Sequence, residues 1–157
     1  MSQQNVEIVL LAMDRLGESY RNGAATDGLL DLCAPGIRVD ASHRVFNPAV
    51  YDGRAGVRRA MQDVVDAWDD FRASTERLID AGDRVVAIQT IRGRGRVSSA
   101  RVEQKGAVIC TVRDGLVQLI EIWLCQLRVT DKPPYSAKPS SGLEPETPSL
   151  PWKCSTN

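Results

Sequence analysis

The sequence has few of the residues on which metal, disulfide and redox sites depend. It contains one histidine, His43, and four widely spaced cysteines that form no CxxC pair. A structural zinc site needs about four such ligands at short spacings, and the chain has neither an HExxH motif nor a clustered acidic motif. No glycine string has the spacing of a dinucleotide site. We therefore expect no metal, no disulfide and no cofactor.

An excess of charge of one sign and long apolar runs are also lacking. Lys and Arg number 20, as do Asp and Glu, so the formal net charge at pH 7 is zero. This balance argues against a nucleic-acid or anionic-membrane partner. There is no run of about 18 apolar residues, and the stretch MSQQNVE lacks the charged and apolar regions of a signal peptide. We expect a cytoplasmic protein that binds neither nucleic acid nor membrane.

One segment, RGRGR, raises RNA binding as an alternative. Its arginines, Arg92, Arg94 and Arg96, have a common parity, which on a strand places them on one face. The zero net charge and the strand context favour a solvated or subunit-contacting row of arginines over an RNA site.

The periodicity of apolar residues changes along the chain from helical to strand-like. Spacing of three and four predicts helices over residues 5–22, about 26–33 and from 53 to about 68, the last with Asp52 as a candidate N-cap. Alternation predicts strands at 37–43, 71–80, 84–96, 101–113 and 116–129. This order predicts an α+β fold, in which a curved antiparallel sheet forms a cone with three helices over its concave face. The domain spans 1–129, and 130–157 read as a proline-rich tail because they hold six of the eight prolines.

The stretch Gly106 to Cys125 predicts a hairpin that turns at Asp114-Gly115. With a two-residue turn, Val112, Cys110, Val108 and Gly106 share a face with Val117, Leu119, Glu121 and Trp123. This is the drier face, so Glu121 is predicted to stand as one carboxylate in an apolar cavity, where lost solvation raises its pKa. The alternatives are a structural Glu121 that pairs with an inward arginine and a Glu121 that lies near the open end of the sheet.

The same counting gathers other side chains around Glu121. A two-residue turn at Ser98-Ser99 places Gln89 opposite Val108, and His43 ends the inner face of the first strand. Glu121 and His43 are therefore the candidate catalytic residues, as proton-transfer group and second acid or oxygen ligand. The alternatives are a solvated His43 and tryptophans that belong to the core. The candidate substrate-binding residues are Gln89, Trp68, Trp123, Tyr20, Tyr51, Val108, Leu119 and Ala41.

The order of elements, with VYDGRAGVRRAM, LIDAGDRVVAI, RGRGRVSSARVE and VRDGLVQLIEIW, resembles the SnoaL-like branch of the nuclear transport factor 2-like superfamily over about residues 5–129. Matched without gaps, the general-base aspartate of its ketosteroid isomerases falls at Ala41 and their oxyanion-hole acid at Val108. The arginine and first aspartate of its limonene epoxide hydrolases fall at Gln89 and Ile91, and the second aspartate falls at Glu121. The resemblance thus implies the fold, and it implies that only Glu121 keeps a carboxylate at a matched catalytic position. It also implies a homodimer formed through the outer face of the sheet.

Three functions follow from these patterns. The first is an enzyme that binds a small, largely apolar molecule and performs cofactor-independent acid–base chemistry, such as isomerisation, cyclisation, dehydration or epoxide opening. The second is a non-catalytic ligand-binding protein that uses the same pocket. The third is a protein interaction module that acts through the outer sheet face or the tail.

Overall fold

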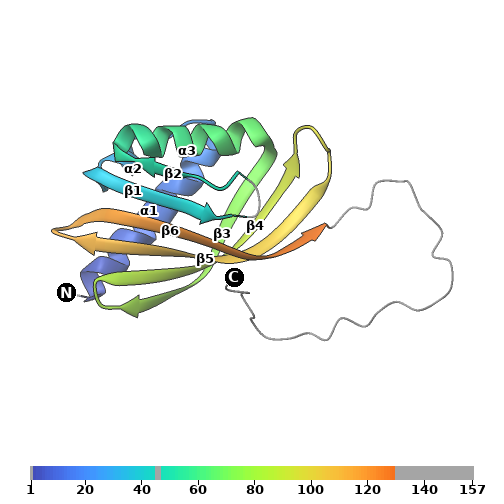
Figure 1. Ribbon diagram of the computed structural model, residues 1–157. Helices are drawn as coiled ribbons and strands as arrows, with labels where there is room; N and C mark the ends of the chain where they lie inside the picture. Colours follow the sequence, from blue (N-terminus) through green and yellow to red (C-terminus); the bar gives the residue numbers. More distant parts are fainter. Residues whose placement is uncertain (1, 45–46, 130–157) are drawn as a thin grey trace.

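A computed structural model describes residues 2–44 and 47–129, which form a curved six-stranded sheet with helices against it (Figure 1). All neighbouring strands are antiparallel except β1 and β6, which run parallel, and the two edge strands β2 and β3 do not pair. The predicted α+β class with a cone-shaped sheet is confirmed, as an open sheet with one parallel pair. The spatial order is β2-β1-β6-β5-β4-β3, with β1 (Cys33–His43), β2 (Val50–Asp52), β3 (Trp68–Ala81), β4 (Arg84–Gly95), β5 (Arg101–Arg113) and β6 (Leu116–Val129).

Three helices, α1 (Ser2–Asn22), α2 (Asp27–Leu30) and α3 (Gly53–Ala67), cover the sheet. Figure 1 shows α3 running alongside β1 and β2. Arg54, in the first turn of α3, fixes that end by donating two hydrogen bonds, of 3.0 and 2.7 Å, to the carbonyl oxygen of Cys33. Asp52 is the N-cap residue of α3, as predicted, but its side chain does not cap the helix. Its carboxylate instead accepts a hydrogen bond of 2.8 Å from Arg38 Nε.

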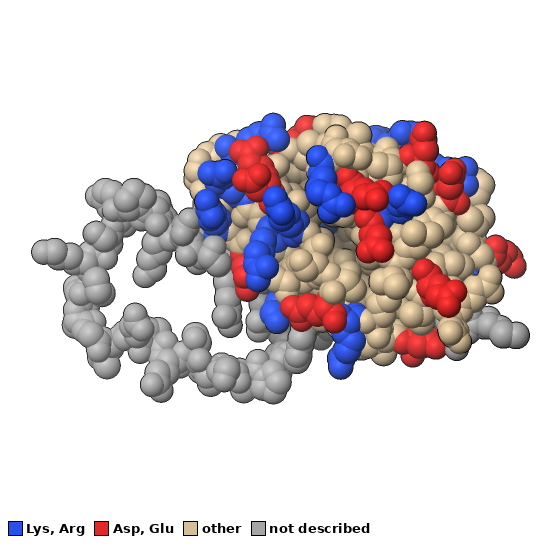
Figure 2. Space-filling model, turned by 180° about the vertical axis from the view of Figure 1, so that it is seen from behind, with Lys and Arg blue, Asp and Glu red and all other residues tan. Residues whose placement is uncertain are grey.

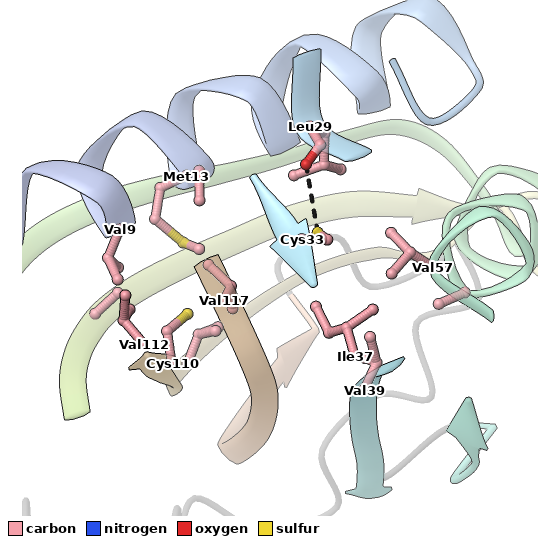
Figure 3. Packing of buried hydrophobic residues seen from close by; sticks show 14 of the residues in the cluster. Val9, Met13, Leu29, Cys33, Ile37, Val39, Val57, Cys110, Val112 and Val117 are labelled. Atoms are coloured by element: carbon pink, nitrogen blue, oxygen red, sulfur yellow. Dashed lines mark hydrogen bonds between the residues drawn. The ribbon is translucent and has the colours of Figure 1, made fainter. Parts of the chain in front are cut away.

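The hydrophobic core lies between the sheet and the helices α1 and α3, with Val9 on α1, Val57 on α3 and Val112 on β5 (Figure 3). Val9 from α1 is fully buried and belongs to the same cluster as Cys110 and Val112. The Cys33 thiol donates a hydrogen bond of 3.3 Å to the Leu29 carbonyl oxygen, which satisfies its polar atom inside this cluster. Both Cys33 and Cys110 are buried free thiols. Val39, Val57 and Val108 of this cluster also face the cavity described below.

Charged side chains of both signs are interleaved on the face that Figure 2 shows. On the sheet, Arg92 pairs with Glu103 at 2.8 Å and Arg94 with Asp70 at 3.1 Å. The arginines of the RGRGR segment therefore have carboxylate partners within the chain. No helix in the described part of the chain combines the length and the apolar character that crossing a bilayer requires.

The remaining expectations about the chain's organisation fall partly outside the described residues. The tail predicted for 130–157 lies wholly outside them. Within the described ranges, no group of three or more His, Cys, Asp or Glu side chains is placed to hold a metal ion.

Candidate functional site

A cavity lies between the concave face of the sheet and the helices α1 and α3. Its volume is about 90 Å³, counted as the space open to the centre of a water molecule, several times what one water needs. Apolar side chains from β4, β5, β6, α1 and α3 make most of its wall. Such a wall favours a small apolar ligand over bulk water. The apolar lining includes Leu16, Val57, Met61, Phe71, Ile91, Val108, Ile120, Ile122 and Leu124.

Gln89 is the most firmly held polar group on this wall. It is 3 % exposed, and its Nε2 lies 3.2 Å from both Thr75 Oγ1 on β3 and Met13 Sδ on α1. Its backbone pairs with Gly106, two residues from the predicted partner Val108, so it keeps the predicted face. Gln89 thus joins α1 to the sheet with its amide nitrogen.

Two further polar groups in the cavity have no hydrogen-bond partner among the residues that the structure describes. Gln104, on β5, is 6 % exposed, and its Nε2 is buried without a hydrogen-bond partner. The Tyr20 ring packs edge-on against Phe71 with 4.6 Å between centroids, and its hydroxyl makes no hydrogen bond with any described residue. Burial raises the pKa of Tyr20, against a smaller opposite effect of Arg44. Both groups are therefore N–H or O–H donors that a ligand oxygen would satisfy.

One end of the cavity carries charge. Arg44 and Asp63 are the only ionisable Arg, Lys, Asp or Glu side chains among the described residues that line it. The Tyr51 hydroxyl donates a hydrogen bond to Asp63 Oδ2. Burial, followed by this hydrogen bond, raises the pKa of Tyr51. Tyr51 itself lines a neighbouring surface groove, which Asp63 shares with the cavity.

Glu121 does not lie in the cavity, because a β-bulge just after the turn exchanges the two faces of β6. Val112 pairs with Val117 as predicted, but the next pair is Thr111 with Leu119, which leaves Gln118 as the extra residue. One extra residue exchanges the two faces of everything that follows. The cavity therefore receives Ile120, Ile122 and Leu124, whereas the outer face receives Leu119, Glu121 and Trp123.

His43 is turned away from the cavity by a second bulge, in β1. Asp40 pairs with Glu121, yet His43 pairs with Trp123, so three residues of β1 span two of β6. The Asp40 carboxylate stabilises this bulge by accepting from the backbone N–H of Ser42 at 3.0 Å and from its hydroxyl at 2.5 Å. The His43 ring stacks on Trp123 outside the cavity. The predicted placement of both candidate catalytic residues in the cavity is thus wrong.

Some of the candidate substrate-binding residues line the cavity, and the others lie outside it. Tyr20, Trp68, Gln89 and Val108 line the cavity. Ala41 is fully buried in the core cluster, whereas Leu119 and Trp123 follow Glu121 to the outer face. The residue facing Gly106 is Leu124, not the predicted indole.

Sequence reasoning missed Arg44, Asp63 and Gln104. Asp63 carries a usable signal, because it stands one position before Val64 in the apolar stripe of α3 and two after Met61. Gln104 shares the parity of Val102 and Val108, which marks it as a polar residue on an inner face. Arg44 has no such signal, since its position depends on the bulge before it.

Comparisons with known proteins agree with this architecture. The family model described as a SnoaL-like domain matches residues 18–120. The structure is similar to an NTF2-like protein from Burkholderia xenovorans LB400, with a TM-score of 0.65 and 20% identity over 79% of this chain and 91% of that one. No curated protein matches the sequence.

Two further solved structures have the same fold with different chemistry in their descriptions. The epoxide hydrolase/cyclase-like enzyme SalBIII, with a role in pyran ring formation in salinomycin, has a TM-score of 0.64 and 17% identity over 81% of this chain and 96% of that one. A hypothetical protein with a ketosteroid isomerase-like fold from Catenulispora acidiphila DSM 44928, in complex with trimethylamine, has a TM-score of 0.63 and 14% identity over 74% of this chain and 84% of that one. Identities this low establish the fold alone.

Proposed function

Because this chain belongs to the SnoaL-like family, a branch of the nuclear transport factor 2-like superfamily, we propose that its cavity binds a small, largely apolar molecule and performs cofactor-independent acid–base chemistry on it. The observation that carries the proposal is the buried Gln104 Nε2, an unpartnered donor in an apolar wall. A buried donor without a partner costs about 1–3 kcal/mol. A carbonyl, ether or epoxide oxygen of a ligand would recover that cost.

The proton-transfer group in this proposal is Asp63. It is the only carboxylate among the described residues that line the cavity, and it replaces Glu121 in that role. A carboxylate there can take a proton from the substrate and return it to a neighbouring atom. The Tyr51 hydroxyl, by donating to Oδ2, fixes the carboxylate in place while Oδ1 stays available. Tyr20 and Gln104 would hold the oxygen on which negative charge develops.

Thermal-shift measurements against apolar ketones, epoxides and lactones test the binding step. A ligand at 100 times its dissociation constant should stabilise the protein by about 2.7 kcal/mol. We expect one class to stabilise the parent protein, and Gln104→Leu to lose at least half of the shift. Gln118→Leu is the matched control, since Gln118 lies at the bulge outside the cavity. Equal shifts in Gln104→Leu and the parent would contradict this assignment.

Turnover of the stabilising class tests the catalytic step. We expect product with the parent protein and a loss of at least 100-fold in kcat with Asp63→Asn, since general acid–base catalysis contributes about 10²–10⁴. Ligand binding without turnover by the parent would identify a non-catalytic binding protein instead.

A further inference from the structure

Arg44 is the one cation among the described residues that line the cavity. It directly follows β1, and its backbone N–H donates to the Ala41 carbonyl oxygen at 3.1 Å. Its side chain is half-buried. None of the described carboxylates lies within ion-pairing distance of its guanidinium, in contrast to Arg92 and Arg94 on the outer face. A partly desolvated guanidinium at a cavity wall thus has N–H donors that no side chain in ranges 2–44 and 47–129 accepts.

Arg44 lines the same cavity as Gln104 and Tyr20. It directly follows His43, which pairs with Trp123 on β6, and the next residue of β6, Leu124, pairs with Gly106 on β5. Gln104 lies two residues further along β5 on the same face. The charge of Arg44 also acts on the Tyr20 phenol, where it opposes the effect of burial on the pKa. Three donor groups thus line one apolar cavity, and the charge of Arg44 reaches one of the other two, the Tyr20 phenol.

The Asp63 carboxylate does not neutralise the charge of Arg44. It lies on the same wall but forms no ion pair with Arg44, and it already accepts the hydrogen bond of Tyr51. It is exposed and belongs also to the surface groove, so water solvates it. Arg44, by contrast, is half-buried beside the apolar wall. Of the two charged groups on the cavity wall, Arg44 is therefore the one without a partner in the part of the chain that the structure describes.

We propose that the ligand of the cavity is a small apolar carboxylic acid, bound as its carboxylate by Arg44. A guanidinium presents two parallel N–H groups that match the two oxygens of a carboxylate, and the pair is stronger where water is partly excluded. The hydrocarbon part would lie against Ile120, Ile122 and Leu124. This inference rests on the proposed function, because it names the substrate class of the same cavity.

Three ligands with one carbon skeleton test the inference by calorimetry at pH 7.5. Cyclohexanecarboxylate, cyclohexylmethanol and cyclohexylmethylamine share the same seven carbons and carry an anionic, a neutral and a cationic polar group at pH 7.5. We expect the carboxylate to bind the parent protein at least 10-fold more tightly than the alcohol, and added salt to reduce this preference. Arg44→Gln should remove the preference, and Arg44→Lys should keep part of it. Arg84→Gln is the control, since Arg84 is exposed and outside the cavity lining.

The outcomes separate this inference from the function on which it rests. If the alcohol or the amine binds as tightly as the carboxylate, the inference is wrong and the cavity remains a ligand site. If the carboxylate preference persists in both Arg44 variants, recognition lies elsewhere and the inference is also wrong. If none of the three ligands binds, and no ketone, epoxide or lactone stabilises the protein, both proposals fail.

Discussion

The imidazole of His43 stacks on the indole of Trp123, with 3.5 Å between ring centroids and 12° between ring planes. The two residues belong to β1 and β6, the one parallel pair of the sheet, and their stack lies outside the cavity. An aromatic pair of this kind contributes about 0.5–1.5 kcal/mol beyond the area that it buries. In this protein, His43 therefore joins two strands that are distant in sequence.

We expect His43→Ala to lower the free energy of unfolding by about 1 kcal/mol, because the stack is lost. Urea denaturation measures this change. His43→Phe, which keeps a stacking ring, should restore most of the loss, and neither variant should alter ligand-induced thermal shifts. A loss of ligand binding in both variants would place His43 in the site after all.

Glu121 gives a second test of the outer-face assignment. Its Oε2 is buried without a partner, which is costly for a carboxylate. We expect Glu121→Gln to raise the free energy of unfolding at pH 7 by about 1 kcal/mol, because the uncharged amide is cheaper to bury. Turnover should be unchanged, in contrast to Asp63→Asn. Loss of turnover in Glu121→Gln with turnover intact in Asp63→Asn would reverse the assignment.

The sequence predicted the elements of this fold better than it predicted the faces of two strands. Alternation located the long strands, and the Asp114-Gly115 turn fixed the pairing of Val112 with Val117. The bulge at Gln118 left no mark in the apolar pattern, since Leu119 and Ile120 are both apolar and either fits the inner face. Glu121 was therefore counted inward, although the true inner row of Ile120, Ile122 and Leu124 is wholly apolar.

Strand register and bulges also decide which other residues of the site the sequence can predict. Gln89 was placed correctly because an error of two residues in register preserves the face. Arg44 follows a bulge that depends on the Asp40 and Ser42 side chains, and no periodicity extends across it. A homodimer through the outer face, where Glu121 and Trp123 now lie, stays a prediction.

Two buried thiols predict how stability depends on alkaline pH. Burial raises the pKa of Cys110 to about 12, with a smaller contribution from Cys33, and it raises the pKa of Cys33 to about 11 against the opposing charge of Arg54. Both thiols start from an ordinary value of 9.0, so above pH 9 the unfolded chain loses protons that the folded protein keeps. Their contribution to stability is complete below that pH and is lost as the pH rises towards 11 and 12.

We expect the free energy of unfolding to fall by up to about 1.4 kcal/mol per pH unit for each thiol between about pH 9.5 and 11. Cys110→Ala should make this slope shallower by that amount, although a small cavity lowers its stability at pH 7. Urea denaturation at several pH values gives the slope of the free energy of unfolding against pH. This slope, and not the absolute stability, is compared between the parent and Cys110→Ala. A slope in Cys110→Ala equal to that of the parent would contradict burial of the thiol in the folded protein.

At Gly106, the neighbouring strand β6 leaves no room for a side chain on β5. A Cβ atom built on it would lie 2.4 Å from the Trp123 carbonyl oxygen and 2.7 Å from Leu124 Cδ2. A leucine methyl group can rotate away, but a backbone carbonyl moves only with its strand. We therefore expect Gly106→Ala to lower the free energy of unfolding by about 2–3 kcal/mol, in the range of overpacked cores.

Gly36 provides the matched control, because a Cβ atom there meets nothing within 4 Å. Gly36→Ala should be neutral or stabilise the protein by up to about 1 kcal/mol, since alanine restricts the unfolded chain. Urea denaturation of both variants checks the contrast. Since Leu124 also lines the cavity, the shift of β6 in Gly106→Ala should reduce ligand-induced stabilisation as well. Equal stability of the two variants would show that β5 and β6 are not as close as this register requires.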